Sequence, residues 1–183
     1  LLEMSGTSVS AALVAGAAAA VRSMFLTDYN PPLEHDCSSS LVKAFLINSA
    51  EGTGPLYEIG YGIPGLDRIT TKADHKFVFV DRRLINRKAH HTANVEVIDP
   101  TIDLRVTLSY LDPPVDYTAA QPFVCELDLL VSDPNGKIFS SPKLSNNERV
   151  VIPHDQLVKG KYTIHVMASN FDTSIEIQYS VVA

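Results

Sequence analysis

A serine, Ser8, stands at the start of a long apolar segment, two residues after Gly6. If this segment is a helix, the backbone N–H of Ser8 lies in the first turn, where it is free to face a negatively charged oxygen. The helix dipole favours negative charge at the same place. Gly6 has no side chain, so a carbonyl group can approach it closely. The arrangement is suited to stabilising an oxyanion beside the Ser8 hydroxyl.

The segment that must position this serine is rich in strong helix formers from Thr7 to about Leu26. Its side chains are small and apolar on all faces, which is typical of a helix packed on every side at the centre of a larger domain. A signal peptide is disfavoured because Glu3, not a positive charge, precedes the apolar run. A membrane span is disfavoured because Arg22 and Ser23 interrupt it. We therefore predict a buried helix.

A second helix, short and buried, is predicted from Ser40 to about Ser49. Serines at positions 38–40 offer an N-cap, and apolar residues follow at helical spacing. Glycines and prolines over residues 51–65 predict repeated turns in place of helices.

Beyond residue 70 the apolar period changes from helical to twofold. Alternation predicts four clear strands, of which the first is expected to be half-buried: 102–110, 123–131, 162–168 and 175–181. Weaker patterns predict three more, over 77–80, 95–98 and 150–152. Turns are expected at 133–136 and 159–160. This strand density favours a mainly β fold with an antiparallel β-sandwich or jelly roll over residues 71–183.

The composition of the chain disfavours two classes of binding partner. The chain of 183 residues is 45% apolar and carries a net charge of -6, which argues against a nucleic-acid backbone or an anionic membrane as its partner. The basic run 82–91 is interpreted as a solvated linker or loop. Two cysteines, Cys37 and Cys125, are too few for a disulfide framework.

The segment Ser5-Gly-Thr-Ser-Val-Ser-Ala-Ala-Leu-Val-Ala-Gly16 resembles the active-site serine motif of the subtilisin-like proteases, with Ser8 at the nucleophile. Ala12 replaces the usual proline and Leu13 a frequent histidine. Residues 40–50 and 60–67 resemble the segments that follow the serine helix in the family. Residues 105–114, 125–136 and 146–150 resemble the β-sandwich of one subtilase branch. The resemblance implies that residues 1–70 are a helical, C-terminal remnant of an α/β catalytic domain and that residues 71–183 form the sandwich.

The resemblance also implies a parent serine endopeptidase that hydrolyses peptide bonds through an acyl-enzyme on Ser8 and needs no cofactor for the chemistry. The backbone N–H of Ser8 would serve as an oxyanion donor. In the family the catalytic aspartate, histidine and oxyanion asparagine precede the serine. Seven residues precede Ser8, so we expect this chain to be inactive alone. The histidines after Ser8 are expected to be surface residues: His35, His75, His90, His91, His154 and His165.

The expected partners are a polypeptide substrate in the parent enzyme and the missing N-terminal catalytic part. Self-association through the serine helix is the alternative way to cover its apolar surface. A secreted or endomembrane compartment is favoured by the resemblance alone.

Calcium is a candidate structural ion, because subtilases often bind it and the loops are rich in acidic residues. The candidate ligands are Glu126, Asp128 and Asp133. Solvated loop acids explain the same residues. The competing functional class is a non-catalytic β-sandwich that binds a partner or stabilises the protease domain.

Overall fold

The computed structural model describes residues 3–27, 36–52, 54–69, 77–115, 124–142, 145–171 and 175–183. Over these ranges the chain is mainly β, as predicted, with helices confined to its first part apart from one short 3-10 turn. The strands form two four-stranded sheets in which every pair of neighbours is antiparallel.

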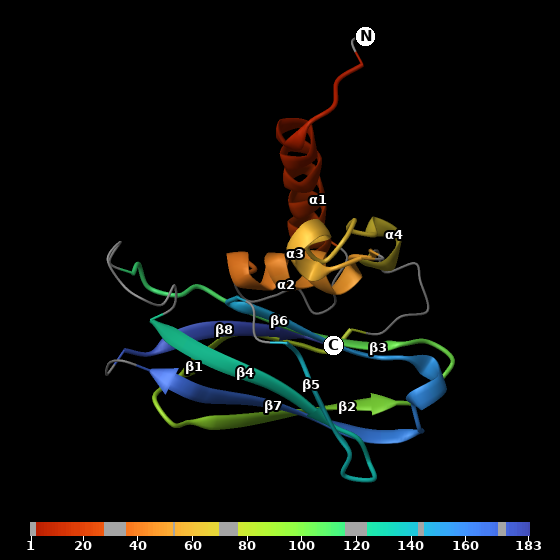
Figure 1. The fold of residues 1–183 in the computed structure, drawn as a ribbon, viewed down its shortest axis with the longest axis vertical. Helices are drawn as coiled ribbons and strands as arrows, with labels where there is room; N and C mark the ends of the chain where they lie inside the picture. Colours follow the sequence, from red (N-terminus) through yellow and green to blue (C-terminus); the bar gives the residue numbers. More distant parts are fainter. Residues whose placement is uncertain are drawn as a thin grey trace.

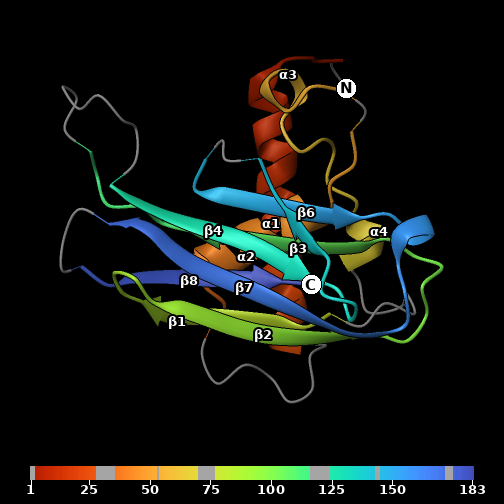
Figure 2. The same ribbon diagram turned by 60° about the horizontal axis from the view of Figure 1, so that its bottom comes forward.

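The two sheets lie one above the other (Figure 1). The upper sheet has the order β1 (Phe79–Ile85), β8 (Ile177–Val182), β3 (Leu104–Tyr110), β6 (Asn147–Ile152). The lower sheet has the order β2 (His90–Val97), β7 (Gly160–Phe171), β4 (Cys125–Ser132), β5 (Ile138–Ser140). A 3-10 turn, η1 (His154–Gln156), precedes β7. Figure 2 shows β2, β7 and β4 side by side.

One hydrophobic core lies between the sheets. In β4 buried and half-buried residues alternate, so Leu127, Leu129 and Val131 point inward. Val106 and Leu108 of the upper sheet belong to the same core cluster and have no exposed surface. The twofold sequence pattern therefore identified the core-facing residues correctly.

The predicted strands are all present in the described residues, with shifted ends. The short strand β5 was not expected. Interpreting the basic run 82–91 as a linker or loop was wrong, because it forms the end of β1, a tight turn and the start of β2. Phe123, at the start of one predicted strand, lies outside the described residues.

Two long helices form where they were expected, α1 (Thr7–Thr27) and α2 (Ser39–Ser49). Ser38 caps α2, since its Oγ accepts a hydrogen bond from the Leu41 N–H at 3.0 Å. Over residues 51–65, where repeated turns were predicted, one single helical turn occurs, α3 (Leu56–Ile59), and a second, α4 (Leu66–Ile69), follows directly. Prolines and glycines bound each turn and do not interrupt it.

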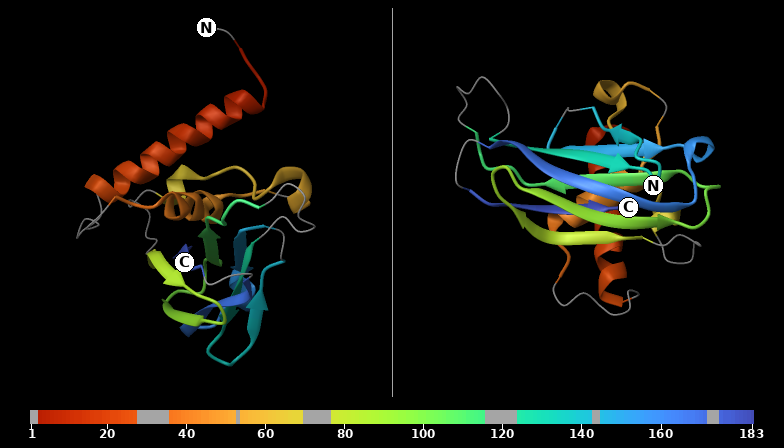
Figure 3. Two further views of the ribbon diagram at one scale, coloured as in Figure 1. Left: turned by 90° about the vertical axis from the view of Figure 1, so that its left-hand side faces the viewer. Right: turned by 90° about the horizontal axis from the view of Figure 1, so that it is seen from below.

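Helix α2 lies across the outer face of the upper sheet (Figures 1 and 3). Beneath it, Thr107 and Ser109 on β3 have no exposed surface. The expectation that this strand is half-buried was therefore wrong. The Asn48 amide of α2 donates to the Thr107 hydroxyl at 3.2 Å and to the Arg105 carbonyl at 2.8 Å, so hydrogen bonds join the helix to this buried second face.

A second hydrophobic cluster joins the helices to this sheet. Phe45 of α2 is 1% exposed, and its ring centroid lies 5.2 Å from those of Phe25 and Phe77 and 6.2 Å from that of Phe79. Val182 of β8 belongs to the same cluster. Side chains from before and after residue 70 thus share one core.

Candidate active site

Ser8 lies in the first turn of α1 and is exposed. The Gly6 carbonyl accepts hydrogen bonds from the N–H groups of Val9 at 3.1 Å and Ser10 at 3.2 Å. The Ser8 N–H belongs to the same turn, where a helix offers no acceptor of its own. The hydroxyl and the N–H thus stand at the positive end of the helix dipole, as an oxyanion site requires.

Gly6 is explained by its backbone. Its φ of +136° is disfavoured for residues with a Cβ, and an added Cβ would have no neighbour within 4 Å. In this structure the glycine is therefore needed for the chain to enter α1.

No described histidine is available as a base for Ser8, because all four are engaged on the sheets or the turn beside them. The His91 Nδ1 is 3.0 Å from the Tyr179 hydroxyl, and the His154 Nδ1 is 3.1 Å from the Asp103 carboxylate. His90 and His165 contact each other at 3.0 Å. The N-terminal end of α1 points away from the sheets in Figures 1 and 3. His35 and His75 lie outside the described residues.

The expectation that α1 is buried on every side was wrong for this chain. Only one stripe of its C-terminal half is buried, formed by Ala17, Val21, Met24 and Phe25. Leu13, in the N-terminal half, is 71% exposed. Small side chains on all faces require neighbours on all faces, and the described residues supply them on one. By length and mean hydropathy, Thr7–Leu26 could also cross a membrane, a property shared by core helices and signal sequences.

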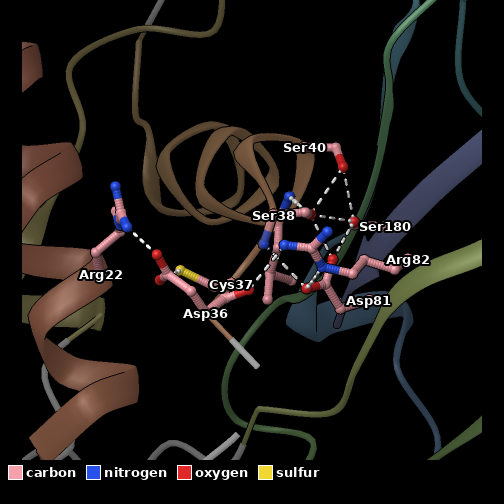
Figure 4. A network of polar contacts seen from close by, with 9 residues as sticks. Arg22, Asp36, Cys37, Ser38, Ser40, Asp81, Arg82 and Ser180 are labelled. Atoms are coloured by element: carbon pink, nitrogen blue, oxygen red, sulfur yellow. Dashed lines mark hydrogen bonds and ion pairs between the residues drawn. The ribbon is translucent and has the colours of Figure 1, made fainter. Parts of the chain in front are cut away.

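A buried polar network fixes the start of α2 to the upper sheet (Figure 4). The Asp81 carboxylate accepts hydrogen bonds from the Ser180 hydroxyl at 2.7 Å, the Ser38 N–H at 3.0 Å and the Ser38 hydroxyl. Ser40 completes the network at 2.9 Å from both serine hydroxyls. A β-bulge between Val80 and Arg83 directs Asp81 toward α2. The sequence signalled only the N-cap serines, and Asp81 was missed.

Around this network, two arginines hold the segment before α2. Arg22 of α1 pairs with the Asp36 carboxylate, and Arg82 donates to the Asp36 carbonyl at 2.9 Å. Arg82 has a φ of +54°, the strained conformation found at such bulges. The two helices and β1 are therefore linked at one point.

A single arginine fixes the other end of α2. The Arg149 guanidinium of β6 donates to the carbonyls of Ile47 and Ala50, both at 2.8 Å, and lies 5.1 Å from the centre of the Tyr61 ring. The last carbonyls of a helix have no partner within it and favour positive charge. Burial lowers the pKa of Arg149, but an arginine stays charged in proteins, so this cap is ionic.

Replacing Asp81 with alanine is expected to lower the free energy of unfolding by about 2 kcal/mol, because the buried hydroxyls of Ser38 and Ser180 lose a charged acceptor. Urea unfolding checks this. In a double-mutant cycle with Ser180→Ala, a coupling energy of about 1 kcal/mol is expected, and strict additivity would contradict the network.

A pocket of about 330 Å³ opens between α1 and α2, with Arg22, Cys37 and Lys43 among its lining residues. Ser8 is not among them. Burial is the main cause that raises the pKa of the Cys37 thiol, so this cysteine is a poor nucleophile. The pocket therefore adds no group to the serine.

The calcium candidates do not come together. Glu126 and Asp128 lie on β4, and the Asp133 carboxylate accepts the N–H groups of Asn135 and Lys137 in its own turn, both at 2.8 Å. Within the described ranges, no three His, Cys, Asp or Glu side chains form a group that could hold a metal ion. The three candidate side chains therefore form no common group among the described residues, and calcium binding stays a sequence prediction.

Comparison with known families finds a match for the first third of the chain. The model of the subtilase family (Peptidase_S8) matches residues 1–62, which include Ser8, α1 and α2. No curated protein matches the chain. Residues 1–62 are thus similar to the subtilases, and the match supports a subtilisin-like serine protease as the origin of this part of the chain.

Proposed function

We propose that the protein is part of a serine endopeptidase in which Ser8 is the nucleophile. The observation that carries the proposal is an exposed serine in the first turn of α1, within the segment that matches the subtilases. The Ser8 oxygen attacks the carbonyl carbon of a peptide bond, and the proton leaves to a general base. The carbonyl oxygen becomes an oxyanion beside the Ser8 N–H, and the amine leaves when the acyl-enzyme forms.

The 183 residues are proposed to be inactive by themselves. A serine hydroxyl without an adjacent base is a weak nucleophile. The four described histidines all bond to other groups on or beside the sheets, away from the end of α1 that carries Ser8. The base, its aspartate partner and a second oxyanion donor are therefore proposed to come from another segment.

The proposal also covers the fold of the two parts of the chain. We assign the paired sheets, residues 71–183, to a β-sandwich of jelly-roll type and residues 1–70 to the C-terminal remnant of an α/β catalytic domain. The exposed faces of α1 would be covered by the rest of that domain, or by a second copy of α1 when it is missing.

A stabilising role of the β-sandwich is the second candidate function. Asp81 and Arg149, both from the sheets, hold the two ends of the short helix α2. That helix packs on α1, which carries Ser8. The sheets would then fix the orientation of the serine helix without taking part in the chemistry.

A fluorophosphonate probe, which labels activated serines, tests both parts of the proposal. We expect no rapid labelling of Ser8 in the 183-residue chain. The gene product extended by the codons upstream of Leu1 should be labelled stoichiometrically at Ser8, and its Ser8→Ala variant should not. An extended product without labelling at Ser8 overturns the endopeptidase, whereas rapid labelling of the short chain overturns only its inactivity.

A further inference from the structure

Two histidines face each other on the outer surface of the lower sheet. His90 of β2 and His165 of β7 are diagonal neighbours across the strand pair, because His165 lies opposite Thr92 and His90 opposite Met167. Their facing nitrogens, His90 Nε2 and His165 Nδ1, are 3.0 Å apart. The ring centroids are 5.2 Å apart, so the rings meet edge to edge through these nitrogens.

Ser132 of β4 positions the second ring from its other side. Its Oγ lies 3.0 Å from His165 Nε2 and 3.5 Å from the Thr163 carbonyl. A hydroxyl that donates to this carbonyl accepts from the imidazole, so we assign the His165 proton to Nε2. His165 Nδ1 then presents a lone pair to His90, whose Nε2–H donates to it.

This geometry is close to that of two imidazoles on one metal ion. Zinc–nitrogen bonds are about 2.0–2.1 Å long, so two nitrogens at a tetrahedral angle are about 3.3 Å apart. A small rotation of the exposed His90 ring, with transfer of its proton from Nε2 to Nδ1, would give two neutral ligands that point at one position. No net proton is released. The bond from His165 Nε2–H to Ser132 is the second contact that usually fixes a ligand histidine.

The side chains around the pair do not oppose a bound cation. His165 is half-buried and His90 is exposed. The outward residues directly opposite the two histidines are uncharged: Thr92, Leu130 and Met167. The next residue on this face of β4, Asp128, lies opposite Met167, and its acidic side chain would not repel a cation.

We propose that His90 and His165 form a two-histidine site for a borderline divalent metal ion of the zinc, nickel or copper type, with Ser132 as its positioning residue. Imidazole suits these metals. No three potential ligand residues cluster among the described ones, so water completes the coordination. The site lies on the opposite side of the sheets from α1 and is independent of the proposed protease function (Figures 1 and 2).

Calorimetric titration of the untagged chain with zinc chloride at neutral pH tests the proposal. We expect one zinc ion per chain, with affinity lowered at least tenfold in His90→Ala and in His165→Ala. Ser132→Ala should weaken binding about tenfold, since it leaves both ligands but loosens one. His154→Ala is the matched control, an exposed histidine that contacts Asp103 and not the pair, and it should bind zinc like the unmodified chain.

NMR spectra of the ring protons provide a second readout. Zinc should shift the signals of His90 and His165 and leave those of His91 and His154 in place. Equal zinc affinity in the two ligand variants and the unmodified chain would overturn the site. Failure of the unmodified chain to bind zinc would do so as well.

Discussion

Replacing Phe45 with alanine is expected to lower the free energy of unfolding by about 4 kcal/mol. The ring is 1% exposed and meets three other phenylalanine rings, from α1, β1 and the segment before β1. Its removal loses the burial free energy of the side chain, and the cavity loses further contacts because rings on three sides cannot close on it together. Chemical unfolding followed by circular dichroism measures the change.

Leu13→Ala is the control for this effect. Leu13 is 71% exposed on α1, so its truncation should change stability by less than about 0.5 kcal/mol. A loss below about 1 kcal/mol in Phe45→Ala would mean that the helices are not packed on the sheet as described. An equal loss in the two variants would mean that the exposed half of α1 is covered in solution.

Replacing Arg149 with alanine is expected to destabilise the chain by about 3 kcal/mol. The substitution removes the donors to the Ile47 and Ala50 carbonyls and the contact with the Tyr61 ring. Hydrogen bonds to a charged group contribute about 1.5–3 kcal/mol, and buried carbonyls left without a donor add a desolvation cost. Urea unfolding measures the loss of stability. Faster amide hydrogen exchange in the last turn of α2 would show that the loss arises at this end of the helix.

Arg149→Lys separates charge from geometry. An ammonium group keeps the charge but lacks the planar fork that reaches both carbonyls, so we expect it to recover less than half of the loss. Tyr61→Phe, which loses the hydroxyl bond to the Asn147 carbonyl at 2.7 Å, should cost only about 1 kcal/mol. Full recovery with lysine would show that the guanidinium geometry is not required.

The sequence predicts where the helices and strands lie better than it predicts which elements pack against each other. Alanine content and the N-cap serines locate α1 and α2, and alternation along β4 identifies its inward face. These signals are local, since they depend on residues a few positions apart. The element that covers the outer face of β3 is distant in the sequence, so no local pattern predicts it. Thr107 and Ser109 are polar enough for a solvated face, yet α2 covers them.

In the candidate site, too, local features were predicted from the sequence and contacts between distant segments were not. The segment around Ser8 identifies the serine and places it in the first turn of α1, and the family match includes it. The pattern of α1 alone does not show which of its faces is covered, because a helix apolar on all faces looks the same with or without its neighbours. The proximity of His90 and His165 was not predicted, since 75 residues separate them and only strand pairing brings them together.

The network at the start of α2 also determines the order in which the chain can be assembled. Ser38 and Ser180 are 142 residues apart, although their hydroxyls are 3.1 Å apart. At translation rates of about 5–20 residues per second, Ser180 leaves the ribosome about 7–28 s after Ser38. During that interval β1, whose Phe79 packs on Phe45, has no neighbouring strand, because its partner β8 is the last strand of the chain. The sheet under α2 therefore stays incomplete until the last strand is synthesised.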